Sequence, residues 1–233
     1  MEDAPNLIKF ASVHPYVTLP QPAQRYIPEW YKKSDRFTGG DNKPVINANG
    51  SSNRGIKTCM GFLDGLTSGY IAELWQDVYV KQAPLEIHWK TDPQVMTELS
   101  PSIASIMPVP QGHHPNNFAW LDPYVIQTPP GYSCMITHPL NRFDLPFTTL
   151  SGIVDSDGIL PSHANMPFFL KTDFEGIIPA GTPIFQITPF KRSDWVSERS
   201  EELAEESKRS EWLTNSVVHG WYKKNLWQLK KYQ

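Results

Sequence analysis

The sequence predicts a mainly β protein: a jelly-roll or β-sandwich core with an extended arm before it and a helix after it. Three observations predict this class. Short runs of alternating apolar and polar residues recur through the middle of the chain, and turn residues separate them about every 8–12 positions. The third is proline, present at 22 of 233 positions. Because proline can neither donate to a strand ladder nor continue a helix, such a chain favours short strands.

Composition and charge narrow the class of protein further. The 21 basic and 24 acidic residues give a net charge of −3, so no overall positive charge attracts nucleic acid. The two cysteines, Cys59 and Cys134, are too few for a disulfide scaffold and lack the spacing of a zinc site. No apolar run approaches the roughly 20 residues that span a bilayer. We therefore expect a soluble cytoplasmic protein without membrane contact.

Three regions differ in composition. Residues 1–55 are rich in proline, glycine and asparagine and predict an extended N-terminal arm that wraps the core. Residues 56–192 contain the alternating runs and predict the β-sandwich core domain. Residues 193–233 contain no proline and predict a helical C-terminal extension, with Ser193-Asp194 as its N-cap and a break near His219-Gly220.

Within the core, period-two alternation and turn residues place the strands. Alternation is clearest at residues 85–90, and a proline-glycine turn at 129–131 separates two further runs. Only residues 93–106 have the pattern of a short helix. The predicted strands lie at residues 69–81 (one strand or a pair), 85–90, 124–128, 132–137, 149–155, 166–171, 174–178 and 182–189.

The histidines raise the question of a metal site. Jelly-roll enzymes of the cupin type hold iron with two or three histidines and a carboxylate. This sequence has no His-X-His or His-X-Asp pair, and the adjacent His113 and His114 would point to opposite faces of a strand. His138 and His163 stand alone. The pattern favours loop histidines bonded to backbone, so no metal or other cofactor is predicted, with a cupin-like metal enzyme as an alternative.

The densest polar patch comprises residues 138–144 and 151–158. Polar groups in a proline-rich loop are costly to bury unless they bond one another or a ligand. Arg142 can hold a carboxylate or phosphate through two parallel hydrogen bonds. Asp155 and Asp157, two positions apart at a strand end, share a face and could hold a cation or an arginine. The candidate ligand-binding residues are His138, Asn141, Arg142, Asp144, Asp155 and Asp157.

Two interpretations of this patch stay open. An ion pair between Arg142 and an aspartate could pin two loops together, or a small anionic or nucleotide-like ligand could lie between residues 138–144 and 155–158. No catalytic residue is assigned, because the sequence contains no nucleophile elbow, phosphate loop or zinc signature. Ser151 and Ser156 have no histidine at a diagnostic spacing. We expect a non-catalytic binding or assembly protein.

One set of motifs resembles the dUTPase and dCTP deaminase superfamily. It comprises Pro130-Gly131-Tyr132, the Gly-x-x-Asp step at 152–155 and the closing stretch at 178–186. The resemblance implies a dUTPase-like β-fold, with Asp155 contacting a sugar and Gln186 following the closing turn. The family's Arg-Ser-x-x-x-Gly motif and the tyrosine after its aspartate are missing here. A nucleotide hydrolase or deaminase that uses Asn141, Arg142 and Asp155 is therefore the alternative function.

A closer resemblance is to an uncharacterised family, a domain of unknown function, found in bacteria and tailed phages. The motifs are Pro130-Gly131-Tyr132, Pro139-Leu140-Asn141, the Gly-x-Val-Asp-x-Asp-like step at 152–157, and Gly181-Thr182-Pro183-Ile184. This resemblance implies a phage-type structural or host-interaction protein, located in the host cytoplasm or the virion.

Both ends of the chain carry more aromatic residues than an arm or linker needs. Burying a phenylalanine-sized group is worth about 1.5–3 kcal/mol, so these residues favour docking on protein. The tail at 221–233 alternates aromatics with lysines, a pattern that single-stranded nucleic acid also accepts. We expect the ends to join subunits of a homo-oligomer or larger assembly. The alternative is that both fold back on their own core.

Overall fold

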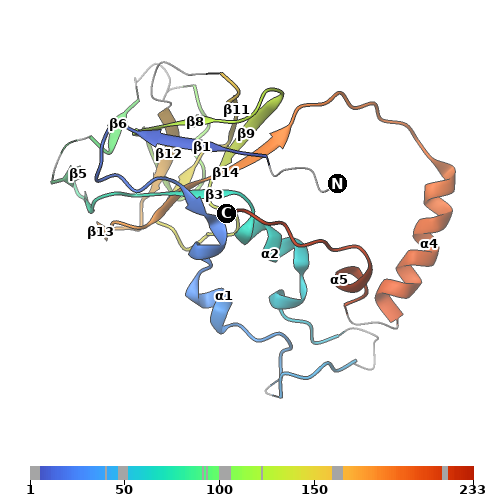
Figure 1. Cartoon of the computed structure of the whole chain (residues 1–233). Coiled ribbons are helices and arrows are strands. Elements are labelled where there is room, and N and C mark those ends of the chain that lie inside the picture. Colours follow the sequence, from blue (N-terminus) through green and yellow to red (C-terminus); the bar gives the residue numbers. More distant parts are fainter. Residues whose placement is uncertain are drawn as a thin grey trace. The chain divides into compact units, whose positions relative to one another are not determined.

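The structure, a computed structural model, describes residues 6–39, 41–46, 52–90, 92, 94–99, 106–121, 123–158, 165–216 and 220–233, without the side chains of 209 and 211–216 (Figure 1). The protein is mainly β, as predicted. The chain forms two compact units. The β unit comprises Met1–Tyr26, Gly69–Arg192 and Tyr232–Gln233, and the helical unit comprises Ile27–Ser68 and Ser193–Lys231.

Within the described residues, the β unit contains four antiparallel sheets. The largest has the order β11 (Gly152–Asp155), β9 (Tyr132–Thr137), β14 (Pro183–Lys191), β3 (Tyr70–Glu73) and β2 (Gln21–Pro22). A four-stranded sheet has the order β10 (Phe147–Thr149), β12 (Asn165–Lys171), β7 (His113–Leu121) and β6 (Met96–Glu98). A three-stranded sheet has the order β13 (Gly176–Ile178), β4 (Val78–Gln82) and β5 (Leu85–Trp89). A two-stranded sheet pairs β1 (Lys9–Ser12) with β8 (Tyr124–Gln127).

The core of the β unit joins the two larger sheets. Trp120 of β7 is fully buried and stacks on Phe168 of β12, with ring centroids 3.9 Å apart. Its Nε1–H donates to Thr149 Oγ1 at 3.3 Å. The Thr149 hydroxyl in turn donates to the carbonyl oxygen of Ile184 in β14, at 2.6 Å, and so links one sheet to the other. Two sheets with a shared apolar interior are the arrangement of the predicted β-sandwich.

Most predicted strands are present. Residues 69–81 contain two strands, β3 and β4, which lie in different sheets. Residues 85–90, 166–171, 174–178 and 182–189 correspond to β5, β12, β13 and β14, whereas the run predicted at 149–155 is divided between β10 and β11. The turn at 129–131 separates β8 from β9, as predicted. These two strands do not pair with each other, however, because β8 pairs with β1 while β9 pairs with β11 and β14.

The helix predicted at 93–106 is wrong in its described part, which contains β6. Met96 of β6 is buried opposite Trp120, so tertiary contacts decide the conformation of this short run. The neighbouring β7, nine residues long, was not predicted. Its first half, His113-His114-Pro115-Asn116-Asn117, has the composition of a loop.

The predicted N-terminal arm at 1–55 is divided between the two units. β1 pairs with β8 and β2 pairs with β3, so the chain as far as Tyr26 belongs to the β unit. The following residues belong to the helical unit, which includes α1 (Glu29–Lys33) and α2 (Met60–Thr67). The long central segment of the β unit ends at Arg192, one residue after β14.

The C-terminal helix begins later than predicted. Residues 193–200 are extended, and α4 (Glu201–Ser216) starts after Ser200, whose Oγ accepts a hydrogen bond from the Leu203 N–H at 3.2 Å. Ser200 therefore replaces Ser193 as the N-cap. The predicted break is present at Gly220, which has φ +88° and precedes α5 (Trp221–Asn225). No helix in the described part of the chain is long and apolar enough to cross a membrane.

The C-terminal tail docks on its own chain. The Trp227 Nε1–H lies 3.0 Å from both carboxylate oxygens of Asp64 in α2, and Lys230 Nζ lies 2.7 Å from Oδ2 of the same aspartate. All three residues belong to the helical unit. In the β unit, Tyr232 packs edge-on against Tyr70 with ring centroids 5.9 Å apart. In the described residues the tail thus contacts α2 and Tyr70 of its own chain.

Candidate functional site

The first half of the predicted polar patch is a loop closed by His138. The Thr149 N–H donates to His138 Nδ1 at 3.2 Å, so Nδ1 carries no proton in the neutral ring. Nε2–H then donates to the Arg142 carbonyl oxygen at 2.9 Å. Burial is the main cause that lowers the pKa of His138. The ring is therefore neutral and both of its nitrogens are engaged within the loop.

Arg142 and Asn141 also serve the loop. The Arg142 guanidinium binds Asp144 through Nε at 2.9 Å and Nη2 at 2.9 Å. This ion pair lies within a single loop, whereas the prediction had it joining two loops. Asn141 has φ +62°, in the left-handed region that asparagine tolerates better than most residues. The Leu140 N–H donates to the buried Gln186 Oε1 at 2.8 Å and so fastens the turn to β14. The structure of this loop therefore accounts for the presence of Asn141, Arg142 and Asp144.

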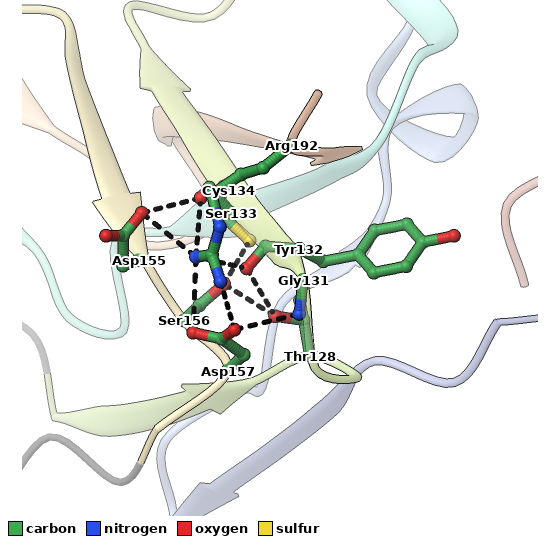
Figure 2. Close-up of polar contacts among 9 residues, drawn as sticks. All are labelled: Thr128, Gly131, Tyr132, Ser133, Cys134, Asp155, Ser156, Asp157 and Arg192. Carbon is green, nitrogen blue, oxygen red and sulfur yellow. Dashed lines mark hydrogen bonds and ion pairs between the residues drawn. The ribbon is translucent and has the colours of Figure 1, made fainter. Parts of the chain in front are cut away.

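The second half of the patch is organised around Arg192, at the end of the β unit (Figure 2). Its Nη1 lies 3.2 Å from Asp155 Oδ1 and 3.2 Å from Asp157 Oδ1, and its Nη2 binds the other oxygen of Asp157. The same Nη1 donates to the Tyr132 carbonyl oxygen at 3.2 Å. The aspartates thus hold an arginine, one of the two partners predicted for them.

Neighbouring hydrogen bonds tie this cluster to the turn at 128–132. The Ser133 hydroxyl donates to Asp155 Oδ1 at 2.6 Å, and the Gly131 N–H donates to Asp157 Oδ2 at 2.9 Å. Behind them, the buried Ser156 Oγ lies 2.9 Å from Thr128 Oγ1 and donates to Cys134 Sγ at 3.3 Å (Figure 2). Burial raises the pKa of the Cys134 thiol, and only the thiolate is a good nucleophile. This network is suited to holding a turn.

The two halves of the patch do not form one site. Asp155 pairs with Ser133 in the β9–β11 register, whereas His138 follows the other end of β9. Five residues of extended chain separate Ser133 from His138, roughly 17 Å. The loop at 138–144 and the turn at 155–158, between which one interpretation placed a ligand, therefore adjoin opposite ends of β9. The sheet register, which the sequence does not reveal, separates them.

The charges of the Arg192 cluster favour ionised carboxylates. The Ser133 hydrogen bond, followed by the Arg192 guanidinium, lowers the pKa of Asp155. The guanidinium, followed by the Gly131 N–H, lowers the pKa of Asp157. A general acid at neutral pH needs the opposite shift, so neither aspartate has the electrostatics of a proton donor.

These lowered pKa values predict how stability depends on pH. A carboxyl whose pKa is lower in the folded state contributes stability above its unfolded pKa, about 3.9, and loses it as the pH falls through the folded pKa. We therefore expect Arg192→Ala to reduce the free energy of unfolding at pH 7 and to differ less from wild type at acid pH. Urea unfolding at both pH values measures this. Lys191→Ala, which removes a neighbouring exposed cation, is the control, and an equal deficit at both pH values would refute the prediction.

His113 and His114 are bonded within the fold. His113 Nδ1 lies 3.0 Å from the Gln111 carbonyl oxygen and its Nε2 lies 2.9 Å from Thr148 Oγ1. His114 Nε2 bonds to Gln82 Oε1. The described residues contain no group of three or more histidine, cysteine or acidic side chains that could hold a metal ion. His163 lies outside the described residues.

The helical unit contains a cavity of about 330 Å³ that the sequence analysis missed. Its lining combines four cationic side chains with four aromatic ones, and no carboxylate lines it among the described residues. The lysine–aromatic alternation of the tail was the one local signal, because the other wall comes from residues 31–63. The cationic residues are Arg36, Arg54, Lys57 and Lys223, and the aromatic residues are Tyr31, Phe37, Trp221 and Tyr222.

Comparison with known proteins adds no family. No protein-family model matches the chain, and no curated protein sequence matches it. The functional argument therefore depends on the geometry of the molecule itself.

Proposed function

We propose that the protein is a non-catalytic binding protein that works as a homo-oligomer, joined through the extended segment at residues 193–200. One observation carries the proposal. The side chains of Trp195 and Val196 in this segment are 89% and 95% exposed. Leaving a tryptophan and a valine in water loses a few kcal/mol of the stabilising free energy that their burial would provide. The valine alone accounts for about 1.5–3 kcal/mol.

The neighbouring helix supports the same conclusion. All the described side chains of α4 are exposed, including the apolar Leu203. Isolated helices shorter than roughly 12–15 residues are marginal in water, and most helices in proteins are stabilised by tertiary packing. A second subunit that covers the exposed side chains at 201–208 and 210 would stabilise this helix of 16 residues.

The state of the predicted site supports a non-catalytic role. His138, Arg142, Asp144, Asp155 and Asp157 all bond to other groups of the β unit. The finer part of the proposal comes from the resemblance to the bacterial and phage family. On that basis the protein is a phage-type structural or host-interaction protein of the virion or host cytoplasm.

Analytical ultracentrifugation tests the oligomer. We expect the wild-type chain to sediment as an oligomer and the double variant Trp195→Ser/Val196→Ser to sediment as a monomer with unchanged circular dichroism. The matched control is Phe143→Ser, which removes another highly exposed aromatic (79%) from a loop of the β unit. It should leave the oligomer intact. A wild-type chain that stays monomeric at all concentrations would disprove the assembly.

The enzymatic alternative has its own test. We expect no turnover when the protein is incubated with each deoxynucleoside triphosphate and monophosphate. Turnover that Asp155→Ala abolishes would replace the present proposal with a nucleotide hydrolase or deaminase.

A further inference from the structure

We propose that the cavity of the helical unit is a binding site for a free nucleotide, a ligand that combines a phosphate group with a planar aromatic base. The proposal is independent of the oligomer and uses none of the residues of the predicted polar patch. Four cationic and four aromatic side chains converge on this one cavity.

The charge of the cavity points to an anion. Arg36, Lys57 and Lys223 form no ion pair with any residue that the structure describes. Some other basic side chains of this protein are paired with carboxylates, as at Arg142, Arg192 and Lys230. Cations gathered without a counter-charge repel one another, and a phosphate removes that repulsion by accepting charge-assisted hydrogen bonds.

The cations are held in position by their surroundings. Arg36 Cζ lies 5.6 Å from the centroid of the Phe37 ring, and stacking leaves the N–H groups at the edge of the guanidinium available. Lys57 Nζ lies 5.9 Å from the Tyr31 ring centroid and donates to the Lys32 carbonyl oxygen at 2.7 Å. An ammonium group has three donors, so two remain. Such preorganisation reduces the entropy lost when a ligand binds.

The aromatic residues offer a surface for a base. Tyr31 and Phe37 are buried beneath the cavity, whereas Trp221 and Tyr222 are only partly covered. Stacking of a base on an aromatic side chain is tolerant of base identity, because every base has a π-face. We therefore expect the phosphate to contact the cations and the base to contact the partly exposed rings.

The cavity wall that carries Trp221 and Lys223 is held in place by contacts between the tail and α2. Asp64 of α2 binds both Trp227 and Lys230, and this contact holds the tail segment against residues 27–68 within the helical unit. Next in sequence to Arg36 and Arg54 of the opposite wall, a Cβ at Gly55 would lie 2.4 Å from the Asp35 carbonyl oxygen, so only glycine allows these two backbones to meet. The cavity thus has two defined walls.

The size of the cavity favours a single nucleotide over a strand. Sites for small molecules have volumes of roughly 300–1,000 Å³, and this cavity, at about 330 Å³, is at the lower end. The whole chain has a net charge of −3, which opposes the long-range attraction that a nucleic acid strand needs.

Isothermal titration calorimetry of the full-length protein tests the site with four probes: adenosine 5′-diphosphate, inorganic pyrophosphate, adenosine and a short oligothymidylate. We expect the diphosphate nucleotide to bind more tightly than either pyrophosphate or adenosine, and its affinity to fall as salt rises. Quenching of Trp221 fluorescence should accompany binding. Binding of pyrophosphate with the same affinity would disprove the role of the base, and much tighter binding of the oligonucleotide would assign the site to single-stranded nucleic acid.

Variants locate the site. Arg36→Ala and Lys223→Ala should each weaken nucleotide binding about tenfold or more, the effect of one lost charge-assisted hydrogen bond. The matched control is Lys33→Ala, which removes an exposed lysine from α1 outside the cavity and should leave the affinity unchanged. These three positions are exposed, so the variants should keep the wild-type unfolding midpoint. Absence of nucleotide binding to the wild-type chain, or equal losses in the control, would overturn the proposal.

Discussion

Replacing Gly69 with alanine is expected to lower the free energy of unfolding of the β unit by about 3 kcal/mol or more. Two costs add at this position. Gly69 has φ +70°, where a residue with a Cβ loses about 1–2 kcal/mol. An added Cβ would also lie 2.0 Å from the Ile187 carbonyl oxygen of β14, which is backbone and cannot rotate away. Relief requires β3 and β14 to separate.

Gly131→Ala is the matched control for this prediction. Gly131 has a similar φ, +82°, but nothing lies within 4 Å of an added Cβ, so this variant should show only the conformational cost of about 1–2 kcal/mol. Urea unfolding of the two variants beside wild type separates the contributions. Equal losses would show that the close approach of Gly69 to β14 does not exist.

Trp120→Ala is expected to cost about 3–5 kcal/mol, the usual range when a fully buried tryptophan is truncated. The indole stacks on Phe168, lies edge-on to Phe147 at 5.0 Å between ring centroids, and donates to Thr149. Its removal leaves a cavity between the two larger sheets and an unfilled position beside the hydroxyl that links them. Both losses weaken the contact between the two larger sheets.

Trp120→Phe provides the comparison, because it keeps an aromatic ring and loses only the hydrogen bond and part of the volume. We expect it to cost about 1–2 kcal/mol. The measurement is again the free energy of unfolding in urea, with the slope of the transition checked for two-state behaviour. If the alanine variant lost no more than the phenylalanine variant, the indole would not be the centre of this core.

The parts of the fold that the sequence predicts are those whose signal is local. β5 alternates apolar and polar residues over its full length because one face packs on the core. β7 shows no such signal, since its first five residues are polar or proline and its pairing with β6 and β12 comes from distant parts of the chain. β6, three residues long, is too short for any periodicity to identify.

The candidate site divides in the same way. The spacing of Asp155 and Asp157 indicated a shared face and a cationic partner, and the structure places Arg192 there. The sequence did not identify that partner, which lies 35 residues away. The prediction also placed the His138 loop beside these aspartates because the two are close in sequence. Sequence proximity does not show that they lie at opposite ends of β9. The cavity of the helical unit was missed for a related reason: its walls are separated in the sequence by all the strands from β3 to β14.

That separation has a consequence for biosynthesis. Residues 27–68 emerge from the ribosome before residues 69–192. Their partner segment at 193–231 follows only after every later strand of the β unit. At translation speeds of about 5–20 residues per second, the wait lasts about 6–25 s. During it, Tyr31 and Phe37, buried in the finished protein, lack the chain that completes their surroundings. Chaperones that recognise exposed aromatic segments in nascent chains would therefore act on this stretch before the rest of the molecule is made.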